Sequence, residues 1–235
     1  MNARTRTAAT LALGILASTG LNAAPLPGFA LTAQTEHFSF YTRSKQAVEA
    51  QKTEQYVAKV EELLGQHLSG RADYYRYSSA EEIQFATGQY AAGLTVATSG
   101  PGQIHSMKAF HPHEIVHLVA EKLGNPGTFF HEGLAVALGD EARWGGKSVN
   151  AIAKDVVKAG QVTSVSALVA QFDRMDPQRA YPVAGSFVAF LIKTQGIAKT
   201  TQFFRACSGG NTATAFQHTF GLSMDEAGTG WVATL

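Results

Sequence analysis

Two short segments carry the residues best suited to chemistry. His113 and His117 lie four positions apart with Glu114 beside the first of them, and Glu132 follows on a second apolar segment. On a helix, residues four apart project from one face, so the two histidines could bind one metal ion together. Glu132 offers a third ligand, and Glu114 could act as a base on a water molecule at the metal. Three protein ligands with one position left open are typical of catalytic zinc.

The same spacing could also belong to two ordinary helix histidines. The segment around them argues against this, because Ile115, Val116, Leu118 and Val119 make it apolar on most sides. Two imidazoles and a carboxylate are costly on a buried helix unless they are paired or bound to a metal. The sequence therefore favours a zinc site.

Start and stop signals in the sequence predict the two helices that carry these residues. Pro112 suits the first turn of a helix over residues 112–123, which stops at the Gly-Asn-Pro-Gly run 124–127. Thr128 is predicted to cap a second helix over residues 129–138. Two helices joined by a short loop fold back on each other, which places Glu132 near the two histidines. Gly133 is small enough to permit a close approach.

The remaining elements predict an α+β fold. We expect a linker over 25–33 and a segment 104–110 that leads into the histidine motif. Ser79 and Glu82 form a capping box for a short helix that ends before Gly88. Strands are predicted at 37–42, 72–77 and 92–99, and helices at 45–68, 149–158, 164–172, 183–194, 198–206 and 211–220. The prediction is one domain over 25–235, with a small mixed or antiparallel sheet and its helices in 25–110, a helical half in 111–235, and the zinc cleft between them.

The N-terminus is typical of an export signal. Arg4 and Arg6 precede an apolar run over 8–17, and small residues at 22–24 offer a cleavage site. We therefore expect residues 1–24 to be removed and the protein to be secreted or periplasmic, without stable membrane insertion after cleavage. An uncleaved anchor helix is the alternative.

The amino-acid composition indicates a folded protein and limits the kinds of partner and cross-link to expect. Hydrophobic residues make up 45% and charged residues 16% of the 235 residues, as in folded globular proteins. The formal net charge of +1 gives no reason to expect nucleic acid as a partner. Cys207 is the only cysteine, which excludes an intramolecular disulfide, and we assign it no role. Nothing in the sequence indicates an oligomeric state.

The motif residues resemble those of a known family. His113-Glu-Ile-Val-His117, followed by Phe130-His-Glu-Gly-Leu-Ala135, is similar to the gluzincin zinc metallopeptidases, specifically to their compact peptidase MA-like group. The helix that contains Tyr181 and the Phe220-Gly-Leu-Ser223 segment are also similar, so the resemblance covers most of residues 25–235. It implies a zincin-like fold and a peptide or protein substrate.

The resemblance also implies residue roles. His113, His117 and Glu132 would bind Zn²⁺, and Glu114 would be the general base. Tyr181 matches the position of a phenol that hydrogen-bonds the tetrahedral oxyanion. The predicted strand over 92–99 matches an edge strand to which an extended peptide adds. The alternative for Tyr181 is that Tyr-Pro simply begins a helix, with the ring packed inside.

The sequence departs from the family pattern in one respect. Val136 stands where some members carry an aspartate that orients a zinc-bound histidine, and Asp140, one turn further on, is a candidate for that task. His111 and His131 flank the motifs without matching ligand positions, so we expect them to be structural or to face the substrate. His105 is unassigned.

The function predicted is that of an exported zinc peptidase, in which Glu114 takes the proton of a zinc-activated water. Two alternatives remain open: a catalytically silent zinc-binding module that recognises a partner, and a zinc amidase acting on cell-wall peptide. Glu114 favours an enzyme, because a structural zinc does not need a base beside its ligands.

Overall fold

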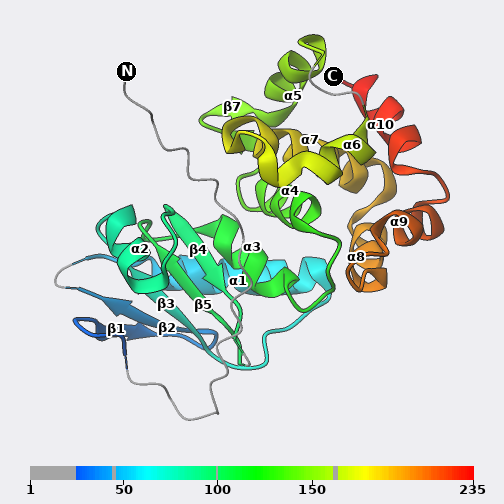
Figure 1. The fold of residues 1–235 in the computed structure, drawn as a ribbon. Helices are drawn as coiled ribbons and strands as arrows, with labels where there is room; N and C mark the ends of the chain where they lie inside the picture. The colour runs from blue at the N-terminus through cyan, green and yellow to red at the C-terminus, as the bar shows by residue number, and fades with distance from the viewer. Residues whose placement is uncertain (1–24, 44–45, 99, 161–163) are drawn as a thin grey trace, which may run out of the picture.

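The computed structural model describes residues 25–43, 46–98, 100–160 and 164–235 (Figure 1). The predicted export signal lies outside the described residues. Within the described part of the chain, no helix is both long and apolar enough to span a membrane.

The first half of the chain builds a five-stranded mixed sheet with the strand order β1-β2-β3-β5-β4. The β2–β3 and β3–β5 pairs are parallel, whereas β1–β2 and β4–β5 are antiparallel, and β4 is an edge strand. The elements of this half are β1 (Ala30–Gln34), β2 (Phe38–Thr42), α1 (Ala50–Leu64), β3 (Ala72–Arg76), α2 (Ala80–Thr87), β4 (Gly93–Val96) and β5 (Gln103–Ser106).

Both faces of the sheet are covered, as the period-two alternation of its strands requires. Phe38, Phe40 and Tyr74 belong to the main core, into which α1 and α3 also pack. On β3 the next residue, Tyr75, points to the opposite face and packs with Ile83 of α2 in a smaller cluster. Figure 1 shows α1 and α2 on either side of the strands.

The second half is helical apart from a short hairpin, and together with the sheet this confirms the α+β class. Its elements are α3 (Pro112–Ala120), α4 (Thr128–Leu138), β6 (Arg143–Trp144), β7 (Lys147–Ser148), α5 (Val149–Lys158), α6 (Val165–Gln171), the 3₁₀ turn η1 (Phe172–Arg174), α7 (Pro177–Gln195), α8 (Ile197–Ala206), α9 (Thr212–Phe220) and α10 (Met224–Val232).

Helix α7 is the centre of this half and packs most extensively against α4. Phe187 of α7 lies in a cluster of buried rings with Phe130 of α4 and Phe216 of α9. Trp231 of α10 closes the cluster and donates its indole N–H to Ser186 Oγ at 2.9 Å. Helix α4, which carries Glu132, therefore packs through Phe130 into this aromatic cluster.

Two predicted segments differ from the structure, and one helix was not predicted. Part of the expected linker is strand β1, whose residues are mostly exposed at a sheet edge and show no regular apolar alternation. Part of the expected lead-in 104–110 is strand β5, which is too short to show a clear alternation. Residues 224–232 form a helix that we did not predict, although Ser223 and Glu226 make a full capping box at its start.

Helix ends were also misplaced. Thr128 is the first residue of α4 rather than its cap, since Gly127 occupies the N-cap position. Helix α7 begins at Pro177 and not at Val183, because Asp176 Oδ1 accepts from the N–H of Gln178. The long helix predicted from 45 to 68 covers only 50–64, since Gly65 ends it in the left-handed conformation.

Candidate metal centre

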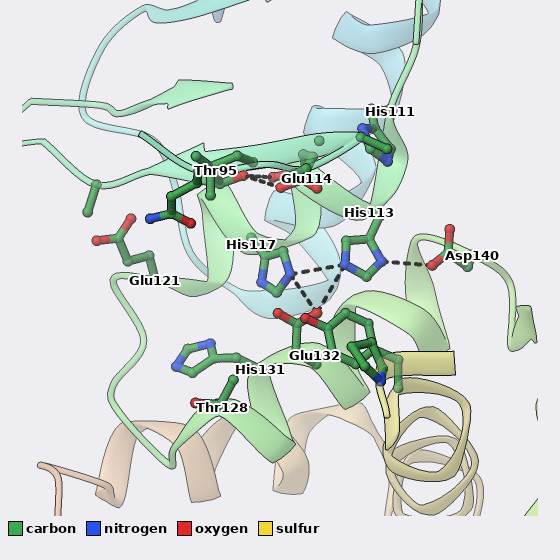
Figure 2. A pocket seen from close by; sticks show the side chains of 18 of the residues that line it. Thr95, His111, His113, Glu114, His117, Glu121, Thr128, His131, Glu132 and Asp140 are labelled. Carbon is green, nitrogen blue, oxygen red and sulfur yellow. Dashed lines mark hydrogen bonds and ion pairs between the residues drawn. The ribbon is translucent and has the colours of Figure 1, made fainter. Parts of the chain in front are cut away.

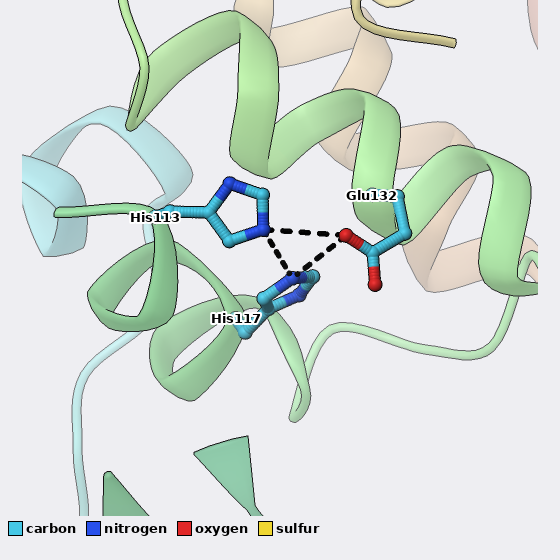
Figure 3. Close-up of side chains that lie close together, drawn as sticks. All are labelled: His113, His117 and Glu132. Atoms are coloured by element: carbon cyan, nitrogen blue, oxygen red, sulfur yellow. Dashed lines mark hydrogen bonds and ion pairs between the residues drawn. The ribbon is translucent and has the colours of Figure 1, made fainter. Parts of the chain in front are cut away.

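Three side chains from two helices converge on one point (Figure 3). His113 Nε2 lies 3.1 Å from His117 Nε2 and 3.2 Å from Glu132 Oε2, and His117 Nε2 lies 3.3 Å from the same oxygen. The two histidines come from successive turns of α3 and the glutamate from the second turn of α4. The structure therefore brings together all three residues predicted as ligands.

These distances suit a shared metal ion. Tetrahedral ligands with bonds of about 2.0–2.1 Å to zinc lie about 3.3–3.4 Å from one another. Two imidazole nitrogens and a carboxylate oxygen are also a donor set that zinc accepts in catalytic sites. Among the described residues, His113, His117 and Glu132 form one of two groups whose side chains could hold a metal.

Asp140 fixes the protonation of the first histidine. His113 Nδ1 lies 2.7 Å from Asp140 Oδ2, so this nitrogen carries the proton that the carboxylate accepts. Nε2 of a neutral His113 then has only a lone pair, and it faces the carboxylate oxygen of Glu132. Two acceptors that face each other in this way need either a proton or a metal cation between them. The contact also answers the question left by Val136, because Asp140 takes the orienting position.

Gly139 allows the contact between Asp140 and His113. A Cβ at position 139 would lie 2.5 Å from His113 Cα and 2.7 Å from His113 N. A side chain there would push the end of α4 away from α3, and Asp140 with it.

The charges around the centre act strongly on one another. Burial opposes ionisation of Glu132, yet the neighbouring His117 and His113 hold the pKa of its carboxyl well below its usual range. Burial likewise disfavours charge on His113, but the hydrogen bonds to Asp140 and Glu132 raise its pKa. Both shifts show that the centre attracts positive charge.

Glu114 lies beside the three predicted ligands without joining them (Figure 2). Its side chain is buried, and its carboxylate is close enough to raise the pKa of His113 and of Tyr181. Glu114 Oε2 lies 2.9 Å from Thr95 Oγ1 of strand β4. The structure thus places this carboxylate between the edge strand and the predicted ligands.

Tyr181 also borders the centre, but not at a helix start. It lies inside α7, with its ring stacked on Phe172 at 5.7 Å and edge-on to Trp144 at 5.5 Å. Burial, followed by the negative charges of Glu132 and Glu114, raises the pKa of its phenol. The hydroxyl therefore stays protonated and can donate a hydrogen bond.

All five predicted site residues line one cavity of about 1190 Å³. Its wall includes residues of β4, α3, α4 and α7, together with residues of the loops between elements. The wall thus combines the edge strand of the sheet with the helical half, which is the arrangement expected for an extended ligand lying along β4.

The other histidines differ in their surroundings. His111 is buried beside the centre, where burial lowers its pKa to about 2 and its Nδ1 lies 2.9 Å from Ser106 Oγ. His131 borders the cavity and packs edge-on against Phe204. His105 lies within the sheet, 2.8 Å from the Tyr77 hydroxyl. None of the three belongs to the group around Glu132.

Cys207 borders the cavity as well. Burial raises the pKa of its thiol to about 11, so the sulfur is protonated and a poor nucleophile.

The second group of potential ligands is explained by ion pairing. It contains Glu36, His37 and Glu54 at the junction of β2 and α1. His37 Nδ1 lies 2.6 Å from Glu54 Oε1, and its Nε2 lies 3.4 Å from Glu61 Oε2. Both ring nitrogens thus face carboxylate oxygens of α1, which accounts for this group without a metal.

Sequence reasoning missed two residues that contact the site. Thr95 was placed on a predicted strand without a role, and Trp144 was not singled out. Neither carries a motif of its own. The alternation of β4 could have placed Thr95 on the same face as Gly93, but the contact to Glu114 depends on how α3 packs on the sheet.

Comparisons with known proteins add little. No protein-family model and no curated protein matches the chain. Among solved structures, the fold is similar to an M1 zinc metallopeptidase from Deinococcus radiodurans, with a TM-score of 0.46 and 16% identity over 88% of this chain and 50% of that one. A point mutant of the same enzyme gives a TM-score of 0.47 and 15% identity over 88% of this chain and 51% of that one. The chain spans about half the length of these structures, and similarity at this level assigns no residue role.

Proposed function

We propose that the protein is an exported zinc-dependent peptidase of the gluzincin type. The observation that carries the proposal is the convergence of His113, His117 and Glu132 with Glu114 at the wall of the same cavity. A metal held for structure alone would need neither the cavity nor the additional carboxylate.

Each residue of the site would have its own role in the reaction. His113, His117 and Glu132 would hold zinc, which supplies Lewis-acid polarisation of a carbonyl and makes water more acidic. Glu114 would take a proton from the attacking water and pass it to the leaving amine. Tyr181 would donate a hydrogen bond to the oxyanion as charge develops on it. The free edge of β4 would hold an extended peptide by main-chain hydrogen bonds.

Metal analysis of the purified protein, combined with hydrolysis of a broad peptide library, tests the proposal. We expect stoichiometric zinc, cleavage of some peptides, and loss of cleavage when a chelator removes the metal. Zinc without cleavage of any peptide would favour a partner-recognition module. Absence of zinc would rule out both. Cleavage confined to cell-wall peptides would identify the amidase alternative, which uses the same residues.

Replacing Tyr181 by Phe tests the oxyanion role. The variant keeps the ring that stacks on Phe172 and loses only the hydroxyl. Loss of one oxyanion donor lowers kcat by about 10²–10³-fold in other hydrolases, and we expect a decrease toward that range with zinc affinity unchanged. The measurement is kcat and bound zinc on the same preparation. An unchanged kcat would remove Tyr181 from the mechanism.

Replacing Asp140 by Asn tests the orientation of His113. The amide keeps the size of the carboxylate but accepts from His113 Nδ1 more weakly and carries no charge. Loss of such a partner reduces metal affinity by about 10–100-fold. Competition with a zinc-binding dye would measure the change. Wild-type affinity in Asp140→Asn would contradict the role.

A further inference from the structure

Strand β4 contacts the catalytic carboxylate directly. Thr95 Oγ1 lies 2.9 Å from Glu114 Oε2 and also 2.9 Å from the main-chain oxygen of Glu114 (Figure 2). The side chain of Glu114 is buried, with 6% of the residue exposed, so its oxygens depend on protein partners or enclosed water.

The contact has a defined direction. A threonine hydroxyl has one proton to donate, and an ionised carboxylate can only accept. A hydrogen bond to a charged acceptor is stronger than one to a carbonyl, so the proton goes to Oε2 while Glu114 is ionised. If Glu114 then takes up a proton at Oε1, Oε2 remains an acceptor. The bond to Thr95 can therefore persist in both protonation states.

Gly93 leaves the second oxygen free. It precedes Thr95 by two positions, so both residues present the same face of β4. A Cβ at position 93 would lie 2.7 Å from Glu114 Oε1 and 2.1 Å from Cε1 of His111. Any side chain there would displace the Glu114 carboxylate or the His111 ring. The ring is itself held by Ser106, whose Oγ lies 2.9 Å from His111 Nδ1.

We propose that Thr95 is a positioning residue, which fixes the orientation of the Glu114 carboxylate through a hydrogen bond to Oε2. The inference rests on the proposed peptidase function for its catalytic consequence, but the contact can be tested without turnover. Strand β4 then has two tasks, since its face holds the base and its edge borders the substrate.

Three variants separate this role from a structural one. Thr95→Val replaces the hydroxyl by a methyl group of similar size, and Thr95→Ser keeps the hydroxyl. Thr53→Val is the matched control, because Thr53 is buried on α1 and its Oγ1 has no hydrogen-bond partner among the described residues. Kinetics on the best library peptide and bound zinc are measured for each.

We expect Thr95→Val to lower kcat by about 10–100-fold, as small misplacements of a catalytic group do, with KM and zinc unchanged. Thr95→Ser should stay within about threefold of wild type, since it can make the same charge-assisted bond. Thr53→Val should leave kcat unchanged. Wild-type kcat in Thr95→Val, or a serine variant as slow as the valine variant, would overturn the proposal.

A double-mutant cycle tests the contact itself. Urea unfolding of wild type, Thr95→Val, Glu114→Ala and the double variant should show coupling of about five- to tenfold in the unfolding equilibrium constant. If the wild type binds zinc but cleaves no peptide, the peptidase proposal fails, and this cycle still decides whether Thr95 holds Glu114. Additive effects of the two substitutions would overturn the inference.

Discussion

Glu114→Gln should bind zinc as the wild type does and lose nearly all peptide cleavage. The amide keeps the size of the carboxylate and can still accept from Thr95, so the local geometry is retained. It cannot take a proton from water at neutral pH, which removes general-base catalysis. Such catalysis contributes about 10²–10⁴-fold, and we expect kcat to fall by that factor.

The measurement pairs single-turnover kinetics with metal analysis on one preparation. Glu114 differs here from His113 and His117, because replacing a ligand would release zinc and could destabilise the helices that hold it. Glu114→Gln separates chemistry from metal binding. If it cleaves peptides at the wild-type rate, the base is another group and the assignment of Glu114 is wrong.

The position of the two histidines could be predicted from the sequence because helix geometry fixes it locally. A spacing of four on one helix determines that His113 and His117 share a face, whatever the rest of the chain does. Glu132 needed one more step, and the short loop between the two apolar segments supplied it. The predicted ligands were brought together as expected, while their binding of zinc remains a proposal.

Contacts made by tertiary packing were harder to predict from the sequence. Asp140 reaches His113 only because Gly139 lets the end of α4 lie against α3. Thr95 reaches Glu114 only because α3 packs beside β4. Asp140 could be named as a candidate from its position one turn after Val136, but which histidine it contacts depends on packing. No local pattern indicated the contact between Thr95 and Glu114.

Strand β1 and the start of α7 were mispredicted for other reasons. Strand β1 is mostly exposed, so it lacks the alternation of apolar residues by which strands are recognised. The start of α7 was misplaced because Pro182 stands within the helix, where proline normally ends or kinks it. The N-cap at Asp176 and the proline at position 177 indicate the true start of the helix.

Gly133→Ala should destabilise the protein and disturb the site at the same time. Gly133 follows Glu132 on α4 and faces α7, where an added Cβ would lie 2.8 Å from the main-chain oxygen of Ala184 and 2.6 Å from Cγ2 of Val188. The main chain of α7 cannot rotate away as a side chain can, so the two helices must separate. Overpacking of this kind costs about 1–3 kcal/mol, which outweighs the gain of up to about 1 kcal/mol from alanine in a helix.

The functional consequence follows from the position of Tyr181. It lies one turn before Ala184 on α7, so moving α7 away from α4 also moves the phenol away from Glu132. We therefore expect Gly133→Ala to lower both the free energy of unfolding and kcat, whereas Tyr181→Phe lowers kcat alone.

Gly230→Ala provides the matched control for this prediction. Gly230 lies inside α10, and among the described residues a Cβ there would meet only Phe190 Cζ, at an ordinary contact distance of 3.5 Å. The same substitution should therefore stabilise the protein by about 0.5–1 kcal/mol and leave kcat unchanged. Urea unfolding of both variants measures the difference. If Gly133→Ala is as stable as Gly230→Ala, the added methyl group carries no steric cost, and helix propensity alone sets the outcome at both positions. The close approach of α4 and α7 then does not hold the site together.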